Sequence, residues 1–330
     1  MIVSCKDKDE VGEELWYIGC TKCNEMIERA QSTPSHADPE YMMSLKTLGE
    51  TFCKGGEEIS SDYVFEVEKQ NQHNVKMTSD TNTCSIAGMC GLASGELLVA
   101  DDGNSKLKLL NSSYEVVGSY NVSGRIIDLC STGQREAAML VDNCFVLLVR
   151  VEAGKIETVR TIHGLDLNDC TGLAYQGGKL YIAAMFELYV YDMESKIKRM
   201  LYRNEIKLGD ATALTVSYCA ISPGGSRICF TDKYHGRLMT INQGDSKYQT
   251  KDLPSCNTVH ITWAGHVFVS CYNSDAVVQI VERDGKQAVR TLVGMKDGLT
   301  KPSSMFFNSI TNSLLVSQHG NDNIVEFELK

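Results

Sequence analysis

Asp128, Asp169 and Asn257 are the side chains in this 330-residue chain that come nearest to a metal-binding set. Hard divalent cations take several oxygen ligands, which carboxylates and amide carbonyls supply. The three residues are far apart in the sequence, with His260 close to the last of them. They can therefore act together only where a repeating fold returns them to one place. Because Asp and Asn are also common turn residues and strand caps, we favour that structural role and keep a metal-dependent hydrolase or lactonase as the alternative.

The sequence lacks the motifs of the common catalytic and nucleotide-binding sites. It contains no Gly-x-x-x-x-Gly-Lys-Ser/Thr, Gly-x-Gly-x-x-Gly, His-Glu-x-x-His or Gly-x-Ser-x-Gly. Cys20-Thr21-Lys22-Cys23 is the only Cys-x-x-Cys, and no second pair follows at zinc-finger distance. We therefore expect no catalytic residue and no cofactor. The 13 cysteines are odd in number and scattered, so we expect reduced thiols that pack as small apolar residues.

Bulky side chains in expected loops are better candidates for binding. Tyr234, His235, Arg237 and Tyr272 lie in segments rich in Gly, Asn and Ser. A turn requires Gly or Asn at such positions but not an aromatic or cationic side chain. If these loops lie on one face of the fold, the four residues form a mixed polar and aromatic rim, which we predict to be a binding surface.

A repeat in the sequence predicts the strands and loops that would position these residues. Each unit has a turn, an apolar run such as Leu97–Ala100, a loop and a second apolar run. Successive units are 40, 44, 46, 41 and 45 residues apart. They begin near Ser85, Arg125, Asp169, Thr215, Cys256 and Lys301. Units of this length, with room for four short strands and no helix, predict an all-β fold, a six-bladed β-propeller.

The last unit indicates how the ring closes. It offers three strands before the chain stops at Lys330, and a missing fourth strand would expose unpaired backbone groups. We therefore expect an amino-terminal strand to complete blade six. The alternating segments Val75–Met77 and Tyr63–Val67 are the candidates, and we favour a strand near 75–77 because it lies just before the first unit.

The segment ahead of the propeller is expected to be helical and then irregular. Trp16, Cys20, Cys23, Ile27 and Ala30 follow at heptad spacing. We predict an amphipathic or coiled-coil-like helix within 1–32, able to self-associate through residues 10–31 or to lie on the main domain. Residues 33–62 are rich in Ser, Thr, Pro, Gly and Glu, as a linker is. The propeller would then occupy 63–330.

One stretch resembles a known family. Residues 84–108, reading CSIAGMCGLASGELLVADDGNSKLK, are similar to the NHL-type propeller repeat at the carboxyl end of tripartite-motif (TRIM) proteins, above all divergent invertebrate members. Gly320–Ile324 repeats the same turn in unit six. The resemblance is specific in units one, five and six and weak in units two to four. The RING and B-box modules of the ubiquitin ligases in that family are missing. The resemblance implies the recognition end of such a protein, which binds protein or RNA targets through propeller loops.

The distribution of charged residues bears on whether the partner is a protein or a nucleic acid. Residues 1–84 hold 8 Lys/Arg against 16 Asp/Glu, whereas residues 85–330 hold 24 against 26. A nearly neutral repeat region lacks the basic excess of a domain that grips nucleic acid. We therefore expect a non-catalytic module that binds a protein partner, with RNA as the alternative. The chain has no run of 18 apolar residues and no signal-peptide core, so we expect a cytoplasmic protein with no membrane span.

Overall fold

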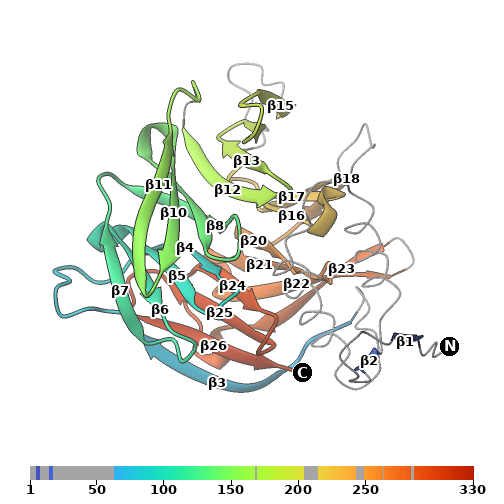
Figure 1. Cartoon of the computed structure of the whole chain (residues 1–330). Coiled ribbons are helices and arrows are strands. Elements are labelled where there is room, and N and C mark those ends of the chain that lie inside the picture. Colours follow the sequence, from blue (N-terminus) through green and yellow to red (C-terminus); the bar gives the residue numbers. More distant parts are fainter. Residues whose placement is uncertain are drawn as a thin grey trace. The chain divides into compact units, whose positions relative to one another are not determined.

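The apolar runs that recur along the sequence form the second strands of six four-stranded sheets in the computed structural model. The structure describes residues 63–167, 169–203, 215–242, 249–262, 264–283 and 286–330, and the short stretches 5–7 and 15–17. Each large sheet is an antiparallel meander, and its innermost strand contacts that of the next sheet until the ring closes (Figure 1). This is a six-bladed β-propeller, so the predicted all-β fold class is confirmed.

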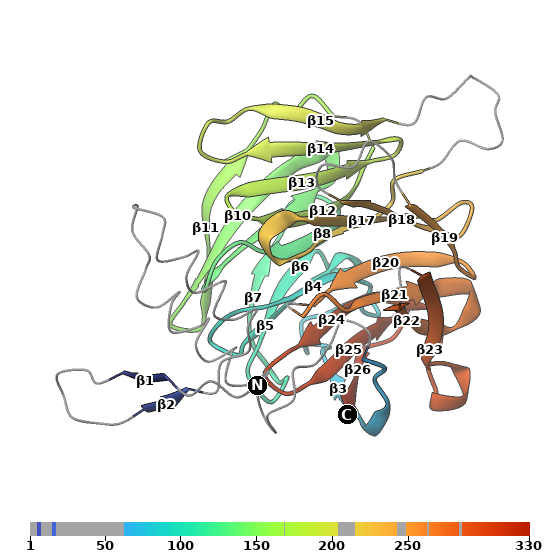
Figure 2. The ribbon, with the colours of Figure 1, turned by 90° about the vertical axis from the view of Figure 1, so that its right-hand side faces the viewer.

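The first three blades follow one another in chain order. Blade one consists of β4 (Ile86–Gly91), β5 (Leu97–Asp101), β6 (Lys106–Leu110) and β7 (Val116–Asn121). Blade two consists of β8 (Ile126–Ser131), β9 (Glu136–Val141), β10 (Phe145–Glu152) and β11 (Lys155–Ile162). Blade three, whose strands Figure 2 shows side by side, consists of β12 (Cys170–Gln176), β13 (Lys179–Ala184), β14 (Glu187–Asp192) and β15 (Lys198–Arg203).

The last three blades include the closing one. Blade four consists of β16 (Cys219–Ile221), β17 (Arg227–Asp232), β18 (Arg237–Asn242) and β19 (Gln249–Asp252). Blade five consists of β20 (Cys256–Ile261), β21 (Val267–Cys271), β22 (Ala276–Arg283) and β23 (Lys286–Val293). Blade six consists of β24 (Pro302–Asn308), β25 (Ser313–Gln318), β26 (Asn323–Leu329) and β3 (Val67–Asn74).

Helical structure in the described ranges is limited to single turns between strands. The turns are η1 (Asp102–Asn104), η2 (Asp142–Cys144), η3 (Pro223–Gly225), η4 (Tyr272–Ser274) and η5 (Met295–Asp297). Within those ranges, no helix has the length and apolar character that crossing a membrane requires.

The apolar core lies between blades rather than at one centre. Buried side chains form six clusters, and each cluster joins two neighbouring blades. Leu98 of blade one and Met139 of blade two share one cluster, and Phe268 of blade five and Leu314 of blade six share another. Each fully buried side chain of this size stabilises the fold by about 1.5–3 kcal/mol relative to exposure. The second strand of a blade is therefore apolar on both faces, as in β5.

The ring closes through a pairing between the two ends of the propeller. β3 pairs antiparallel with β26, from Asn74 opposite Asn323 to Val67 opposite Leu329. Figure 1 shows the blue β3 beside the red β26. The fourth strand of the last blade thus precedes the first blade in the sequence, and the pairing covers an edge that would otherwise be open.

The position of the closing strand corrects the expectation of a strand near 75–77. β3 is an outermost strand with the exposed polar sequence VEKQNQHN, so it lacks the apolar alternation used to find strands. Val75 is fully buried, but it belongs to the cluster between blades six and one. Its backbone N–H donates to the Asp322 carbonyl at 2.8 Å. The apolar residue therefore marks where the chain leaves blade six.

The amino-terminal unit is a separate body in which only two short strands are described. β1 (Cys5–Asp7) pairs antiparallel with β2 (Leu15–Tyr17), with Lys6 opposite Trp16. At Trp16 this corrects the helix expected within 1–32, since Trp and Tyr favour extended backbone. The rest of that helix, including most of the self-association segment 10–31, and the linker 33–62 lie outside the described residues.

Candidate functional site

The loop between β17 and β18 presents the most exposed aromatic side chain of the described propeller. Tyr234 is 80% exposed, whereas most large apolar side chains there are buried. Gly236 shapes the loop, with φ of 63°. A Cβ at Gly236 would lie 2.5 Å from the Leu253 carbonyl oxygen, so only glycine fits there. The tight turn holds Tyr234 away from the body of the blade.

His235 is held by a buried carboxylate in the same turn. Its Nδ1 lies 2.8 Å from Oδ2 of Asp232, which is fully buried. The Thr215 hydroxyl donates to the other Asp232 oxygen at 2.7 Å. In the corresponding turn of blade one, Asn104 donates to Asp101 across the same three-residue step. Asp232 and His235 thus repeat the geometry of a turn, and His235 is positioned by the fold before it meets any ligand.

Arg237 opens β18 beside the same loop. Its Nε lies 3.3 Å from Oδ1 of Asp252, in a pair whose side chains are 37% and 88% exposed. An exposed pair of this kind contributes little to stability. The Arg237 guanidinium therefore remains available to a partner at low energetic cost.

Tyr272 connects three blades at this surface. The Lys233 ammonium of blade four lies 5.9 Å from the centre of its ring, within cation–π range. The His319 ring of blade six lies 5.8 Å from the Tyr272 ring in an edge arrangement. Loops from blades four, five and six thus meet, and the predicted binding residues lie in or beside them. We call Lys233, Tyr234, Arg237, Tyr272 and His319 the loop surface.

The candidate metal ligands are not brought together. Asp128 lies on β8, and its two carboxylate oxygens accept the backbone N–H groups of Leu129 and Leu173 at 2.8 Å each. Asp169 is exposed ahead of β12. Asn257 lies on β20, where its Nδ2 donates to the Ser303 carbonyl. No hydrogen bond joins any two of the three in the described part of the chain, and Asp128 lies within β8, where its side chain connects β8 to β12 of blade three.

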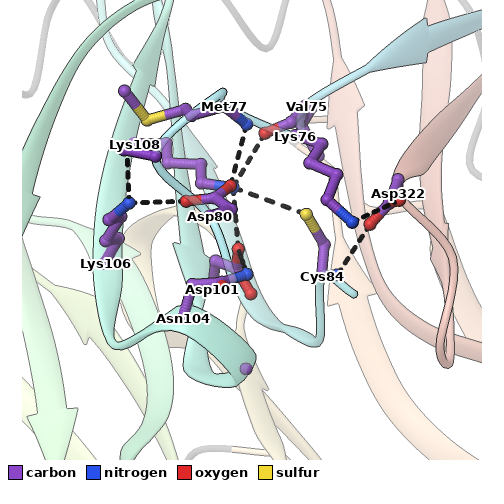
Figure 3. Close-up of polar contacts among 12 residues, drawn as sticks. Val75, Lys76, Met77, Asp80, Cys84, Asp101, Asn104, Lys106, Lys108 and Asp322 are labelled. Carbon is purple, nitrogen blue, oxygen red and sulfur yellow. Dashed lines mark hydrogen bonds and ion pairs between the residues drawn. The ribbon is translucent and has the colours of Figure 1, made fainter. Parts of the chain in front are cut away.

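A second polar site, which the sequence patterns did not indicate, lies where the ring closes. Asp80, Cys84, Asp101, Lys106 and Lys108, here called the closure cluster, join the segment that follows β3 to blade one (Figure 3). The Lys108 ammonium is fully buried. It contacts Asp80 at 2.6 Å and Asp101 at 2.7 Å and donates to the Val75 carbonyl at 2.8 Å. Lys106 contacts the other Asp80 oxygen at 2.6 Å.

The closure cluster is also tied to blade six. Asp322, between β25 and β26, accepts the backbone N–H of Cys84 at 2.9 Å and pairs with Lys76 at 3.1 Å. Asn82 donates to the Gly103 carbonyl at 2.8 Å. A Cβ at Gly103 would lie 2.7 Å from the Thr83 carbonyl oxygen. Because Gly103 has no side chain, the closing segment at Thr83 can pack directly against the Asp-Gly-Asn turn.

The donor set of the closure cluster resembles a metal site that a lysine already fills. Ligand atoms of Asp80, Cys84 and Asp101 lie within 4.8 Å of one another, the one such group of three His, Cys, Asp or Glu found in the described ranges. The Lys108 ammonium contacts all three side chains, with Cys84 Sγ at 3.4 Å. Two lysines balance two carboxylates. Since a divalent cation would meet two ammonium groups, the group does not fit a metal.

Electrostatics in the closure cluster favour the charged carboxylates. Burial alone would raise the pKa of Asp80, but hydrogen bonds from Lys106 and Lys108 outweigh it and lower the pKa to about 2. Burial also opposes ionisation of Asp101, yet hydrogen bonds from Lys108 and the Ser85 N–H lower its pKa. At neutral pH the closure cluster is therefore a network of ionised side chains in which the charges of two lysines and two carboxylates cancel.

The disulfide between Cys144 and Cys170 corrects the expectation that the thiols are reduced. It joins η2 of blade two to the start of β12 in blade three, with the Cα atoms 5.5 Å apart. The 26-residue separation carries no recognisable pattern, since propeller packing brings the two positions together. In the described propeller the other cysteines are free, among them the buried Cys90, Cys219 and Cys229.

Comparison with known proteins supports the fold alone. No protein-family model and no curated protein matches the chain. A protein of unknown function from Bacteroides thetaiotaomicron VPI-5482 has a TM-score of 0.63 at 10% identity, covering 81% of this chain and 77% of that one. Virginiamycin B lyase from Staphylococcus aureus has 0.55 at 9%, covering 81% and 100%. A catalytically inactive variant of that lyase with quinupristin has 0.55 at 10%, covering 79% and 100%.

Proposed function

We propose that this propeller is a non-catalytic recognition module that binds a protein partner through the loop surface. The observation that carries the proposal is the meeting of Lys233, Tyr272 and His319 from three blades beside the exposed Tyr234. Rigid aromatic side chains lose little conformational freedom on binding, and Tyr and Arg are enriched among the residues that dominate interfaces.

The loop surface suits a folded or extended protein segment better than a small substrate. Its aromatic rings and cations come from loops on a rigid scaffold, an arrangement typical of binding surfaces. The carboxylate–imidazole pair of Asp232 with His235 beside it has the geometry of a turn. We therefore infer binding without chemistry. We do not propose the hydrolase, because Asp128 and Asn257 contact different neighbours and no hydrogen bond joins either of them to Asp169 in the described ranges.

The TRIM resemblance agrees with this proposal. The segment 84–108 spans β4, β5 and the start of β6 in blade one. The loop surface lies on blades four to six, of which blades five and six also resemble the repeat and blade four resembles it weakly. We propose that the chain acts as the recognition end of a TRIM-like protein, with partner choice set by the loops that differ between blades. Protein is favoured over RNA because residues 85–330 carry no basic excess.

Photo-crosslinking tests the proposal. A photoreactive amino acid is placed at position 234 or 272, and a matched control is placed at Ile197, which is 57% exposed on blade three. We expect one protein to be crosslinked from both loop positions and not from Ile197. Equal capture from all three positions would contradict the proposal. Capture of RNA that falls steeply with salt would replace the protein partner with RNA.

We place the module in the cytoplasm as part of the same proposal. The buried free thiols, among them Cys84, Cys256 and Cys271, agree with a reducing compartment, whereas the Cys144–Cys170 disulfide is unusual there. Thiol labelling of the protein in lysates prepared with a trapping reagent distinguishes the two states. Labelling of Cys144 only after reduction would argue for an oxidising compartment.

A further inference from the structure

Lys108 and Cys84 form a close nitrogen–sulfur contact that the ion network does not need. The Lys108 Nζ lies 3.4 Å from the Cys84 Sγ, and both residues are fully buried. An ammonium has three hydrogens. Oxygens of Asp80, Asp101 and Val75 already accept them at 2.6–2.8 Å. The sulfur is therefore a fourth neighbour, held close to a nitrogen whose hydrogen bonds are complete.

The same site can take up the proton that chemistry at Lys108 would release. Lys106 remains paired with Asp80 at 2.6 Å whatever happens to Lys108. Asp101 has no second lysine among its contacts in the described ranges, only N–H donors from Ser85 and Asn104. If Lys108 lost its charge, Asp101 would be the carboxylate left without a counter-ion, and it would become protonated.

We propose that Lys108 and Cys84 are a redox modification site, joined through one oxygen atom into a nitrogen–oxygen–sulfur bridge when the protein is exposed to peroxide. The bridge would link the segment that closes the ring to the third strand of blade one (Figure 3). It would replace a non-covalent nitrogen–sulfur contact with a covalent link. The proposal concerns the closure cluster and is independent of the loop surface.

The chemistry balances with two molecules of hydrogen peroxide. The first converts the Cys84 thiol to a sulfenic acid and releases one water. In the second step Lys108 gives one proton to Asp101, a second peroxide is reduced, and the N–O bond forms with release of two waters. One S–H and two N–H bonds break, one S–O and one N–O bond form, and sulfur and nitrogen together lose four electrons to the two peroxides.

Burial sets the pace of this reaction. It raises the pKa of the Cys84 thiol to about 12, and the Asp101 charge adds to the effect. Because the thiolate is the reactive form, the bridge would form on sustained exposure rather than as a rapid response. A buried site also admits small oxidants and excludes protein thiols. We therefore expect the bridge to form slowly, to persist after the oxidant is removed, and to be cleaved by a small dithiol.

Mass spectrometry of the intact chain tests the proposal. After peroxide treatment of the folded protein, the bridge adds one oxygen and removes two hydrogens, a gain of about 14 Da, whereas oxidation to a sulfenic acid alone adds about 16 Da. Trypsin cuts after Lys76, Lys106 and Arg125. The bridge therefore yields peptide 77–106 joined to peptide 107–125, with cleavage after Lys108 blocked.

Matched variants separate the bridge from general oxidation. Cys84→Ser keeps the fold, because the ammonium retains its three oxygen acceptors, and it should lose the crosslinked peptide. Cys229→Ser, at a buried free thiol elsewhere, should keep it. Joined peptides that map to Cys90, which lies in the same tryptic fragment, would overturn the proposal. A gain of oxygen with normal cleavage after Lys108 would also overturn it, as would an unchanged mass.

Discussion

The buried ammonium of Lys108 lies 2.6 Å from a carboxylate oxygen of Asp80, and both side chains are fully excluded from solvent. Asp80 belongs to the segment that has just completed blade six, and Lys108 belongs to blade one. The ring therefore closes through two links: the pairing of β3 with β26 within blade six, and an ion network that holds the segment after β3 against blade one. This second link is the basis of the first prediction.

Lys108→Met should destabilise the propeller by about 3–5 kcal/mol, because it leaves the buried Asp101 carboxylate without its counter-ion. Chemical denaturation followed by circular dichroism measures the loss. Lys69→Met is the matched control, since Lys69 pairs with Glu328 at 2.9 Å but is 61% exposed, and it should unfold almost like the wild type. Equal midpoints for the two variants would show that the buried network contributes nothing special.

Truncation tests the position of the closing strand. A chain that begins at Tyr63 retains β3 and should unfold in one cooperative transition. A chain that begins at Val75 lacks β3, exposes the edge of β26, and should aggregate or unfold over a broad range. Size-exclusion chromatography and thermal melts distinguish them. A soluble, cooperatively melting chain from Val75 onward would show that β3 is not needed for closure.

The pH dependence of stability should separate two buried groups with opposite effects. Burial raises the pKa of Asp128 from 3.8 to about 7, against hydrogen bonds from the Leu173 and Leu129 N–H groups. Burial lowers the pKa of His260 from 6.5 to about 4. Asp128 therefore contributes stability at low pH that is lost as the pH rises towards 7. His260 contributes stability above pH 6.5 that is lost as the pH falls towards 4.

The two effects oppose each other in the wild type between about pH 4 and 6.5. Asp128→Leu should leave the His260 effect, so that its melting temperature rises with pH across this window. His260→Leu should leave the Asp128 effect, so that its melting temperature falls with pH. The readout is the slope of the melting temperature against pH, because a general loss of stability in either variant lowers the whole curve without changing the sign of its slope. Slopes of the same sign in both variants would rule out this assignment.

The disulfide between blades two and three makes a further prediction. Closing the 26-residue separation between Cys144 and Cys170 should stabilise the oxidised protein by about 3.5 kcal/mol in the chain-entropy account. A reducing agent should lower the melting temperature of the wild type to that of the double variant Cys144→Ser with Cys170→Ser. The double variant should not respond to reduction. A wild type that is equally insensitive would mean that the bridge is not formed.

Sequence reasoning found the fold because the inner part of a blade is apolar. β5, β13 and β21 lie between two clusters, so each reads as a continuous apolar run with a turn before it. The closing strand β3 was misplaced because an outermost strand is exposed and polar. Periodicity detects burial, so it locates the inner strands better than the outer ones.

The members of the loop surface were predicted in part, for a reason that lies in turn chemistry. Tyr234 and Tyr272 stand out because no turn requires them, and both lie in the loop surface. Lys233 and His319 were missed as members, since only propeller packing brings their loops beside Tyr272. Lys108 was missed because KLKLL alternates as if its lysines faced solvent. That face is covered by a segment about 30 residues earlier in the chain.

Hydroxyls on the second strands of three blades form a feature that no sequence pattern indicated. Thr231, Ser270 and Ser317 accept a backbone N–H at 3.0–3.2 Å, from Tyr218 just before β16, Thr258 of β20 and Ser304 of β24 respectively. In blades five and six the pairing register shifts at this point. The hydroxyls therefore satisfy N–H groups that a bulge removes from the ladder.

The affinity of the crosslinked partner for the loop surface tests the central claim most directly. Isothermal titration with the double variant Tyr234→Ala and Tyr272→Ala should give binding weaker than wild type by about 30-fold or more, the loss expected when interface-dominating aromatics are removed. The control double variant Ile197→Ala and Met200→Ala removes two exposed apolar side chains of blade three and should bind as the wild type does. Unchanged affinity in the loop variant, or equal losses in both, would contradict the account.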